Sequence, residues 1–143
     1  MYKVLIVEDE DIIRKGLMFM VNWQEAGCVV VGEGVDGQDG LEKIRENRPD
    51  IVIVDINMPV KDGLAMLEES IGQYGYDAII VSGYSEFEYA RKAIGLGVTE
   101  YLLKPVNFNE LYDALDKIIR KQTAAARLRD DMKQIDMEKK KLG

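Results

Sequence analysis

The sequence predicts an α/β fold of the (βα)5 type, in which helices cover both faces of a doubly wound parallel sheet. Five short apolar runs alternate with longer amphipathic segments along 143 residues. Three of the runs are continuously aliphatic and rich in β-branched residues, which is typical of strands buried on both faces. Right-handed crossovers then place helices on both faces, and 2-1-3-4-5 is the common strand order for such an open sheet.

The expected strands are short and separated by helical patterns. They cover residues 3–7, 28–33, 51–54, 78–81 and 100–103. The expected first two helices cover residues 11–21 and 36–47, and a third passes through Leu64, Leu67 and Ile71. Apolar residues recur in these segments at the spacing of a helix face. In the first helix these are Ile12, Ile13, Leu17, Met18 and Met20.

The last two helices carry start and stop signals. The fourth is expected to open at Ser85, because Glu88 stands three residues on and the pair forms a capping box. It ends near residues 95–97, where glycine supplies a left-handed C-cap. The fifth starts at Asn107, and four apolar residues line one face of it: Leu111, Leu115, Ile118 and Ile119.

The chain divides into a folded domain, residues 1–121, and a helical linker or tail, residues 122–143. No sixth strand follows the fifth helix, but the tail repeats apolar residues three, four and seven positions apart. We interpret it as a continuation of the fifth helix that leads toward an output domain. It either pairs as a short coiled coil, weakened by Lys139 within the apolar stripe, or frays into a disordered end.

Composition excludes several classes of protein. The 143 residues include 26 acidic and 19 basic side chains, one cysteine and no histidine, with a net charge of -7. Without histidine there is no Ser-His or Cys-His nucleophile pair and no zinc site of the usual imidazole type. The lone Cys28 cannot form an intrachain disulfide or a site of several thiolates.

Charge and hydropathy set the expected location and partners. The first apolar run is too short for a signal peptide, and no run is long enough to span a membrane, so we expect a cytoplasmic protein. Residues 1–119 carry a net charge of -11, which repels phosphate backbones, and residues 120–143 carry +4. The basic tail alternates with acids and indicates a solvated helix face, so no direct nucleic-acid binding by this domain is expected.

Polar side chains follow four of the expected strands. Glu8 and Asp9 follow the first strand, Asp55 the third, Ser82 the fourth and Lys104 the fifth. In a parallel sheet these residues meet at one carboxyl edge, next to the point where the strand order reverses and where such sheets bind ligands.

This set of side chains predicts a cation site that also accepts phosphate. Two carboxylates about 4 Å apart repel by roughly 4 kcal/mol at an effective dielectric near 20, so the site shifts a pKa or recruits a cation. Oxygen ligands without histidine or cysteine favour Mg²⁺. The Lys104 ammonium and the Ser82 hydroxyl suit the oxygens of a phosphoryl group on a carboxylate.

The motifs at these positions resemble the receiver domain of two-component response regulators, which has a flavodoxin-like fold. They are Glu8-Asp9, Asp55-Ile56-Asn57-Met58-Pro59 with Asp62-Gly63, Ser82-Gly83-Tyr84 and Tyr101-Leu102-Leu103-Lys104-Pro105. The segments 23–27 and 82–90 resemble, more narrowly, receivers that precede an AraC-type helix-turn-helix DNA-binding domain.

The resemblance implies a role for each residue of the acidic site. Asp55 accepts the phosphoryl group from the phosphohistidine of a sensor histidine kinase. Asp9, Asp55 and the main-chain carbonyl of Asn57 bind Mg²⁺, with Glu8 acting through water. Lys104 pairs with the phosphoryl group.

The resemblance also implies a conformational switch. Ser82 hydrogen-bonds to the phosphoryl group and Tyr101 turns inward as Ser82 moves. The Lys104–Pro105 peptide is expected to be cis. Asn57 and Tyr84 flank the path of hydrolytic water and tune the lifetime of the phosphate.

These implications describe a switch that acts as an enzyme only on its own Asp55. Phosphorylation changes the face of the fourth helix, fifth strand and fifth helix, and two copies form a homodimer that controls a DNA-binding output. Two alternatives remain open at this point. One is a Mg²⁺-dependent aspartyl-phosphate phosphatase, disfavoured because Asn57 stands where a second acid is needed. The other is a degenerate receiver that acts only as a dimerisation module.

Overall fold

Five parallel strands form one sheet in the order β2-β1-β3-β4-β5, as the sequence predicts. The computed structural model describes residues 1–83, 88, 91–92 and 95–142. The strands are β1 (Tyr2–Val7), β2 (Cys28–Gly34), β3 (Ile51–Asp55), β4 (Asp77–Ser82) and β5 (Glu100–Leu103). All four strand pairs are parallel, so every strand ends at the same edge of the sheet.

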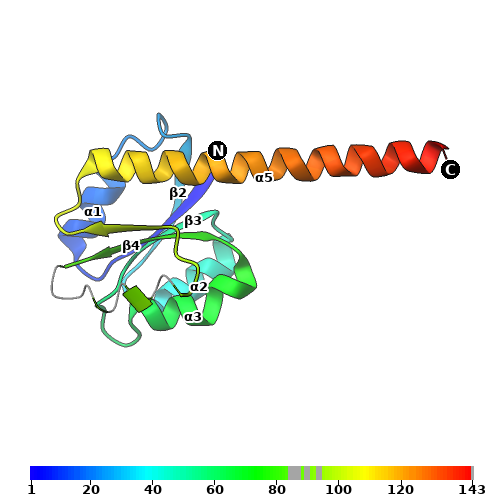
Figure 1. Cartoon of the computed structure of the whole chain (residues 1–143). Helices are drawn as coiled ribbons and strands as arrows, with labels where there is room; N and C mark the ends of the chain where they lie inside the picture. The colour runs from blue at the N-terminus through cyan, green and yellow to red at the C-terminus, as the bar shows by residue number, and fades with distance from the viewer. Residues whose placement is uncertain (84–87, 89–90, 93–94, 143) are drawn as a thin grey trace.

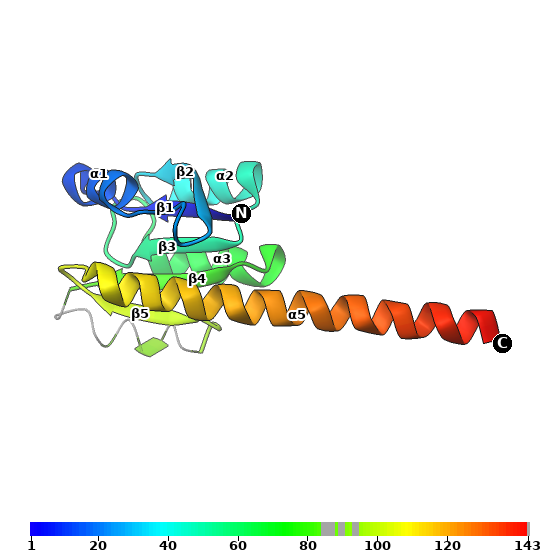
Figure 2. The same ribbon diagram turned by 90° about the horizontal axis from the view of Figure 1, so that it is seen from above.

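Four long helices cover the sheet within the described residues (Figures 1 and 2). They are α1 (Asp11–Met20), α2 (Gly37–Asn47), α3 (Gly63–Tyr74) and α5 (Phe108–Leu142). α1 and α5 pack on one face of the sheet, and α2 and α3 pack on the other. The helix expected to open at Ser85 lies mostly outside the described residues, as does Tyr84.

Side-chain caps explain where three helices begin. The Asp36 carboxylate accepts a hydrogen bond from the Asp39 backbone N–H at 2.8 Å, so Asp36 is the N-cap and α2 starts one residue later than expected. Asp62 caps α3 in the same way through Ala65. Asn107 caps α5, as the sequence predicts, by accepting from the Glu110 N–H at 3.2 Å.

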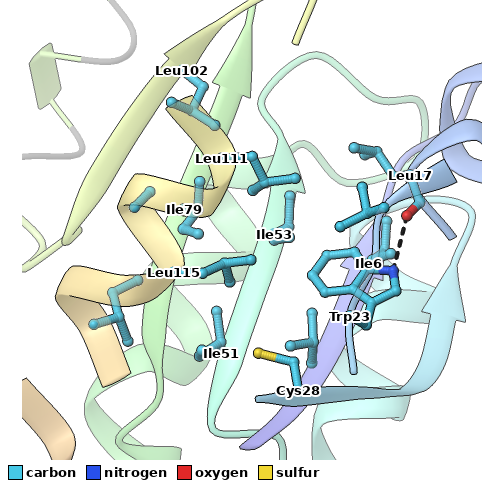
Figure 3. Close-up of a cluster of buried hydrophobic side chains, with 14 of the residues drawn as sticks. Ile6, Leu17, Trp23, Cys28, Ile51, Ile53, Ile79, Leu102, Leu111 and Leu115 are labelled. Atoms are coloured by element: carbon cyan, nitrogen blue, oxygen red, sulfur yellow. Dashed lines mark hydrogen bonds between the residues drawn. The ribbon is translucent and has the colours of Figure 1, made fainter. Parts of the chain in front are cut away.

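The aliphatic runs of β1, β3 and β4 are buried on both faces, as expected for central strands. Figure 3 shows the cluster beneath α1 and α5, in which the Trp23 indole N–H donates to the Leu17 carbonyl at 3.0 Å. This bond ties the loop after α1 to the last turn of that helix. Only one face of α1 packs, because Leu17 is buried while Ile12 and Met20 are 89% and 71% exposed.

The fifth helix is one continuous helix of 35 residues. Its first turns bury Leu111, Leu115 and Ile118 against the sheet, whereas every described residue from 127 onward is exposed. At about 1.5 Å per residue this helix is roughly 50 Å long, and it projects well beyond the sheet (Figure 1). Nowhere in the described part of the chain is a helix both long and apolar enough to span a bilayer.

Candidate functional site

The carboxyl edge of the sheet brings three acids together. Glu8 and Asp9 follow β1 and Asp55 is the last residue of β3, and one carboxylate oxygen from each lies within 4.8 Å of the others. β1 and β3 are neighbours in the sheet, which explains why residues 46 positions apart meet here. Glu8 and Asp55 are each only 2% exposed.

Lys104, directly after β5, completes the cluster. Its Nζ lies 2.9 Å from Asp55 Oδ2, 3.5 Å from Glu8 Oε2 and 4.0 Å from Glu10 Oε1. Its backbone N–H donates to the Ser82 carbonyl at 2.8 Å, and the Lys104–Pro105 peptide is cis. The strand ends therefore hold the ammonium group over the buried acids.

The proximity of these groups changes their titration. Burial, followed by the charge of Asp55, raises the pKa of Glu8 to about 8. Burial also raises the pKa of Asp55, although Lys104 opposes this shift. Burial alone would lower the pKa of Lys104, but the hydrogen bond to Asp55 and the charge of Glu8 raise it. Near neutral pH one of the buried acids therefore keeps its proton, and Lys104 stays charged.

The donor set fits a hard divalent cation. Asp9 Oδ1 and Asp55 Oδ1 are buried, and within the described residues neither has a hydrogen-bond partner. An unsatisfied buried carboxylate oxygen is costly unless a ligand completes it. The groups that face one another are carboxylates, with no histidine or thiol, which favours Mg²⁺ over softer metals.

Ser82 and Tyr101 form a second polar pair beside the acids. Ser82 ends β4, is completely buried, and its hydroxyl shares a 2.7 Å hydrogen bond with the Tyr101 hydroxyl. Val81 of β4 is the partner of Asp55 of β3, so Ser82 lies one residue further toward the carboxyl edge, next to Asp55. Tyr101 is half-buried in β5.

The loop after β3 holds the acid site by close backbone packing. A Cβ on Gly63 would lie 2.3 Å from the Asp55 carbonyl oxygen, so only glycine fits there. The Asn57 side chain is exposed, while its backbone N–H opposes the rise in the pKa of Asp55 that burial causes. Val60 has a positive φ of 68°, a region that β-branched residues rarely occupy.

Sequence reasoning missed Arg14. This residue of α1 is 4% exposed, and its Nη1 donates to the Glu8 carbonyl at 2.8 Å. It also pairs with Asp11, and its Nε lies 3.5 Å from Glu33 Oε1. A charged residue in an amphipathic helix normally indicates the solvent face, so only its position six residues after Glu8 could have drawn attention to it.

The fold and this acidic edge define a class of protein, and the sequence agrees with it. The chain belongs to the family of response regulator receiver domains, whose pattern it matches over residues 4–116. Receiver domains of this family are components of two-component signalling.

Individual relatives narrow the comparison. The uncharacterized transcriptional regulatory protein YesN of Bacillus subtilis is 37% identical over 142 residues, 99% of this chain and 36% of YesN. The transcriptional regulatory protein HptR of Staphylococcus aureus is 38% identical over 84% of this chain and 47% of HptR. The chain therefore spans less than half the length of these curated relatives.

Solved structures agree with both the fold and the narrower resemblance. The REC domain of AraT, a response regulator from Geobacillus stearothermophilus, is 37% identical with a TM-score of 0.83, covering 87% of this chain and 98% of that domain. A two component transcriptional regulator AraC from Clostridium phytofermentans is 30% identical with a TM-score of 0.76, covering 84% and 94%.

Proposed function

We propose that Asp55 accepts a phosphoryl group from the phosphohistidine of a sensor histidine kinase in the cytoplasm. The observation that supports this most directly is the environment of Asp55. Its Oδ2 is held by Lys104, while its Oδ1 is buried beside Glu8 and Asp9 and lacks a partner among the described residues. Asp55 thus offers two carboxylate oxygens, so that one can hold the cation while the other acts as the nucleophile.

The acids would hold the cation that this chemistry needs. Asp9, Asp55 and the main-chain carbonyl of Asn57 are the proposed direct ligands of Mg²⁺, with Glu8 acting through water. Bound Mg²⁺ supplies positive charge that offsets the carboxylates and the phosphoryl oxygens. Binding of a cation by these residues would release the proton that the acid pair holds.

The transfer itself needs little from the protein beyond positioning. An Asp55 oxygen forms the new O–P bond while the N–P bond of the phosphohistidine breaks, and the imidazole leaves with the electron pair. Lys104 then contacts a phosphoryl oxygen in place of Asp55 Oδ2, which needs only a small movement of a flexible side chain.

Ser82 and Tyr101 are the proposed switch. The Ser82 hydroxyl now shares a hydrogen bond with Tyr101, and it can donate to the phosphoryl group once its proton is not given to Tyr101. In this proposal Tyr101 then turns inward and alters the face formed by β5, α5 and the helix expected after Ser85. Asn57 and Tyr84 are proposed to tune how long the phosphate survives.

We propose that phosphorylated copies form a homodimer and thereby control a transcriptional output. The relatives YesN and HptR are named as transcriptional regulatory proteins. An AraC-type DNA-binding output domain, joined through the tail of residues 122–143 to the receiver of residues 1–121, is the arrangement we favour. The receiver itself is not expected to bind nucleic acid or a membrane.

Intact-mass spectrometry with acetyl phosphate and Mg²⁺ tests the acceptor chemistry, with light scattering on the same samples. We expect the mass of one added phosphoryl group in the wild type and in Asp113→Asn, an exposed control. We expect none in Asp55→Asn or without Mg²⁺, and a larger species only in phosphorylated samples. An unmodified wild type would contradict the proposal, and fast turnover of phosphoesters would favour the phosphatase alternative.

A further inference from the structure

The edge of the sheet opposite the acid site binds the tail by hydrogen bonds. Asp77, the first residue of β4, accepts from Lys121 Nζ at 2.8 Å and from Gln122 Nε2 at 2.6 Å. Gln122 Nε2 also donates to the carbonyl of Asp50, the residue before β3, at 3.1 Å. These bonds attach α5 at the point where it leaves the body of the protein.

Two further contacts extend this attachment to β1 and β5. The hydroxyl of Thr99, immediately before β5, donates to Asp77 Oδ1 at 2.7 Å. The hydroxyl of Tyr2, the first residue of β1, shares a 2.6 Å hydrogen bond with the Thr123 hydroxyl. The beginnings of four strands are thus connected, directly or through Asp77, to three consecutive residues of α5.

The carboxyl ends of these four strands carry the candidate site. β1 leads to Glu8 and Asp9, β3 ends in Asp55, β4 ends in Ser82 and β5 leads to Lys104. The strands have only four to six residues and are hydrogen-bonded to their neighbours in the sheet. A strand of this length spans roughly 13–20 Å, and a rigid element of this kind can carry a displacement from one end to the other.

Asp77 is well suited to join these elements. Its side chain is 13% exposed, and it accepts three side-chain hydrogen bonds. Burial alone raises the pKa of Asp77, but the hydrogen bonds from Lys121, Thr99 and Gln122 outweigh burial and lower it. The carboxylate therefore stays ionised, which strengthens each of these bonds.

We propose that Asp50, Asp77, Thr99 and Gln122 form a base clamp that fixes the direction of the tail and transmits occupancy of the acid site to it. A shift of β4 or β5 at its carboxyl end changes the relative positions of Asp77 and Thr99, and with them the attachment of residues 121–123. The transmission part rests on the proposed function. The attachment part stands on the hydrogen bonds alone.

Hydrogen-exchange mass spectrometry of peptides covering residues 119–127 tests both parts. The variants are Asp77→Asn and Gln122→Ala, with exposed Asp113→Asn and Gln134→Ala as matched controls. Each protein is measured alone and with Mg²⁺ and beryllofluoride, and the exchange of the central strand β3 reports on intact folding. Gln122→Ala removes no buried charge, so it tests the clamp even if Asp77→Asn folds poorly.

We expect exchange of residues 119–127 to be about tenfold faster in both clamp variants and unchanged in the controls. Beryllofluoride should change the exchange of this segment in the wild type but not in the clamp variants. Unchanged exchange in Gln122→Ala would overturn the attachment. A beryllofluoride response that persists in the clamp variants, or is absent from a wild type whose melting temperature rises, would overturn the transmission. If beryllofluoride raised the melting temperature of none of the proteins, the wild type included, the result would instead count against the acceptor function.

Discussion

Glu8→Gln should change how the stability of the metal-free protein depends on pH. The wild-type Glu8 has a folded-state pKa of about 8, against 4.5 for the unperturbed group. Between these values the folded state holds a proton that the unfolded state has released. Stability therefore falls as pH rises, by up to about 1.4 kcal/mol per pH unit for one proton.

Between about pH 5.5 and about pH 7.5 the free energy of unfolding of the wild type should therefore fall by at most roughly 2.7 kcal/mol. Glutamine has no proton to lose, so Glu8→Gln should show a much flatter dependence and be the more stable protein at the higher pH. Asp55 lies close enough to share the proton, so the observed value is expected to be below this limit.

Urea unfolding at several pH values, with a chelator present, measures the free energy of unfolding directly. Glu10→Gln is the matched control, because Glu10 is an exposed carboxylate two residues away. The reasoning would be refuted if Glu8→Gln kept the wild-type slope, or if Glu10→Gln removed it as effectively.

Three other changes test neighbouring parts of the argument. Mg²⁺ at ten times its dissociation constant should stabilise the wild type by about 1.4 kcal/mol and raise its melting temperature; an equal rise in Asp9→Ala would place the cation elsewhere. Above about pH 8, where Glu8 is ionised, metal-free Asp55→Asn should be more stable than the wild type by about 1 kcal/mol. It removes repulsion of roughly 3.5 kcal/mol from each of two acids within 4.8 Å while losing the pair with Lys104; a less stable variant at this pH contradicts this account. Val60→Gly should stabilise the protein by up to about 1 kcal/mol, because glycine adopts a positive φ without strain. Val60→Ala should not stabilise it. Equal free energies of unfolding for the two variants would show that Val60 is not strained.

The sequence predicts the strands and the acidic edge for a simple physical reason. Aliphatic runs such as 51–54 are buried away from water on both sides only in the middle of a sheet that helices cover on both faces. Parallel strands also bring their last residues to one edge. The structure accordingly brings Asp9, Asp55 and Lys104 together. The distances between these groups, such as 2.9 Å from Lys104 Nζ to Asp55 Oδ2, depend on how the strands pack and are not encoded in that pattern.

Other features depend on contacts that no local pattern reports. Periodicity marks Ile12 and Met20 as apolar members of a helix, but packing leaves both exposed. Arg14 has the spacing of a solvent-facing residue and is nevertheless buried against the Glu8 carbonyl. Gln122 and Asp77 are 45 residues apart, and their hydrogen bond exists only because α5 passes the start of β4.

The tail has an apolar stripe that is poorly suited to pair by itself. Leu128, Met132 and Ile135 are exposed on one side of α5 at the spacing of a coiled-coil seam. In a parallel, in-register pair, however, Asp131 would face Asp136 of the second copy, and Lys139 would face its own counterpart within the seam. These like charges oppose a pairing that already buries little apolar surface. We therefore expect two tails to pair only when another contact holds the receivers side by side, and the proposed clamp would then make the tail respond to assembly of its domain.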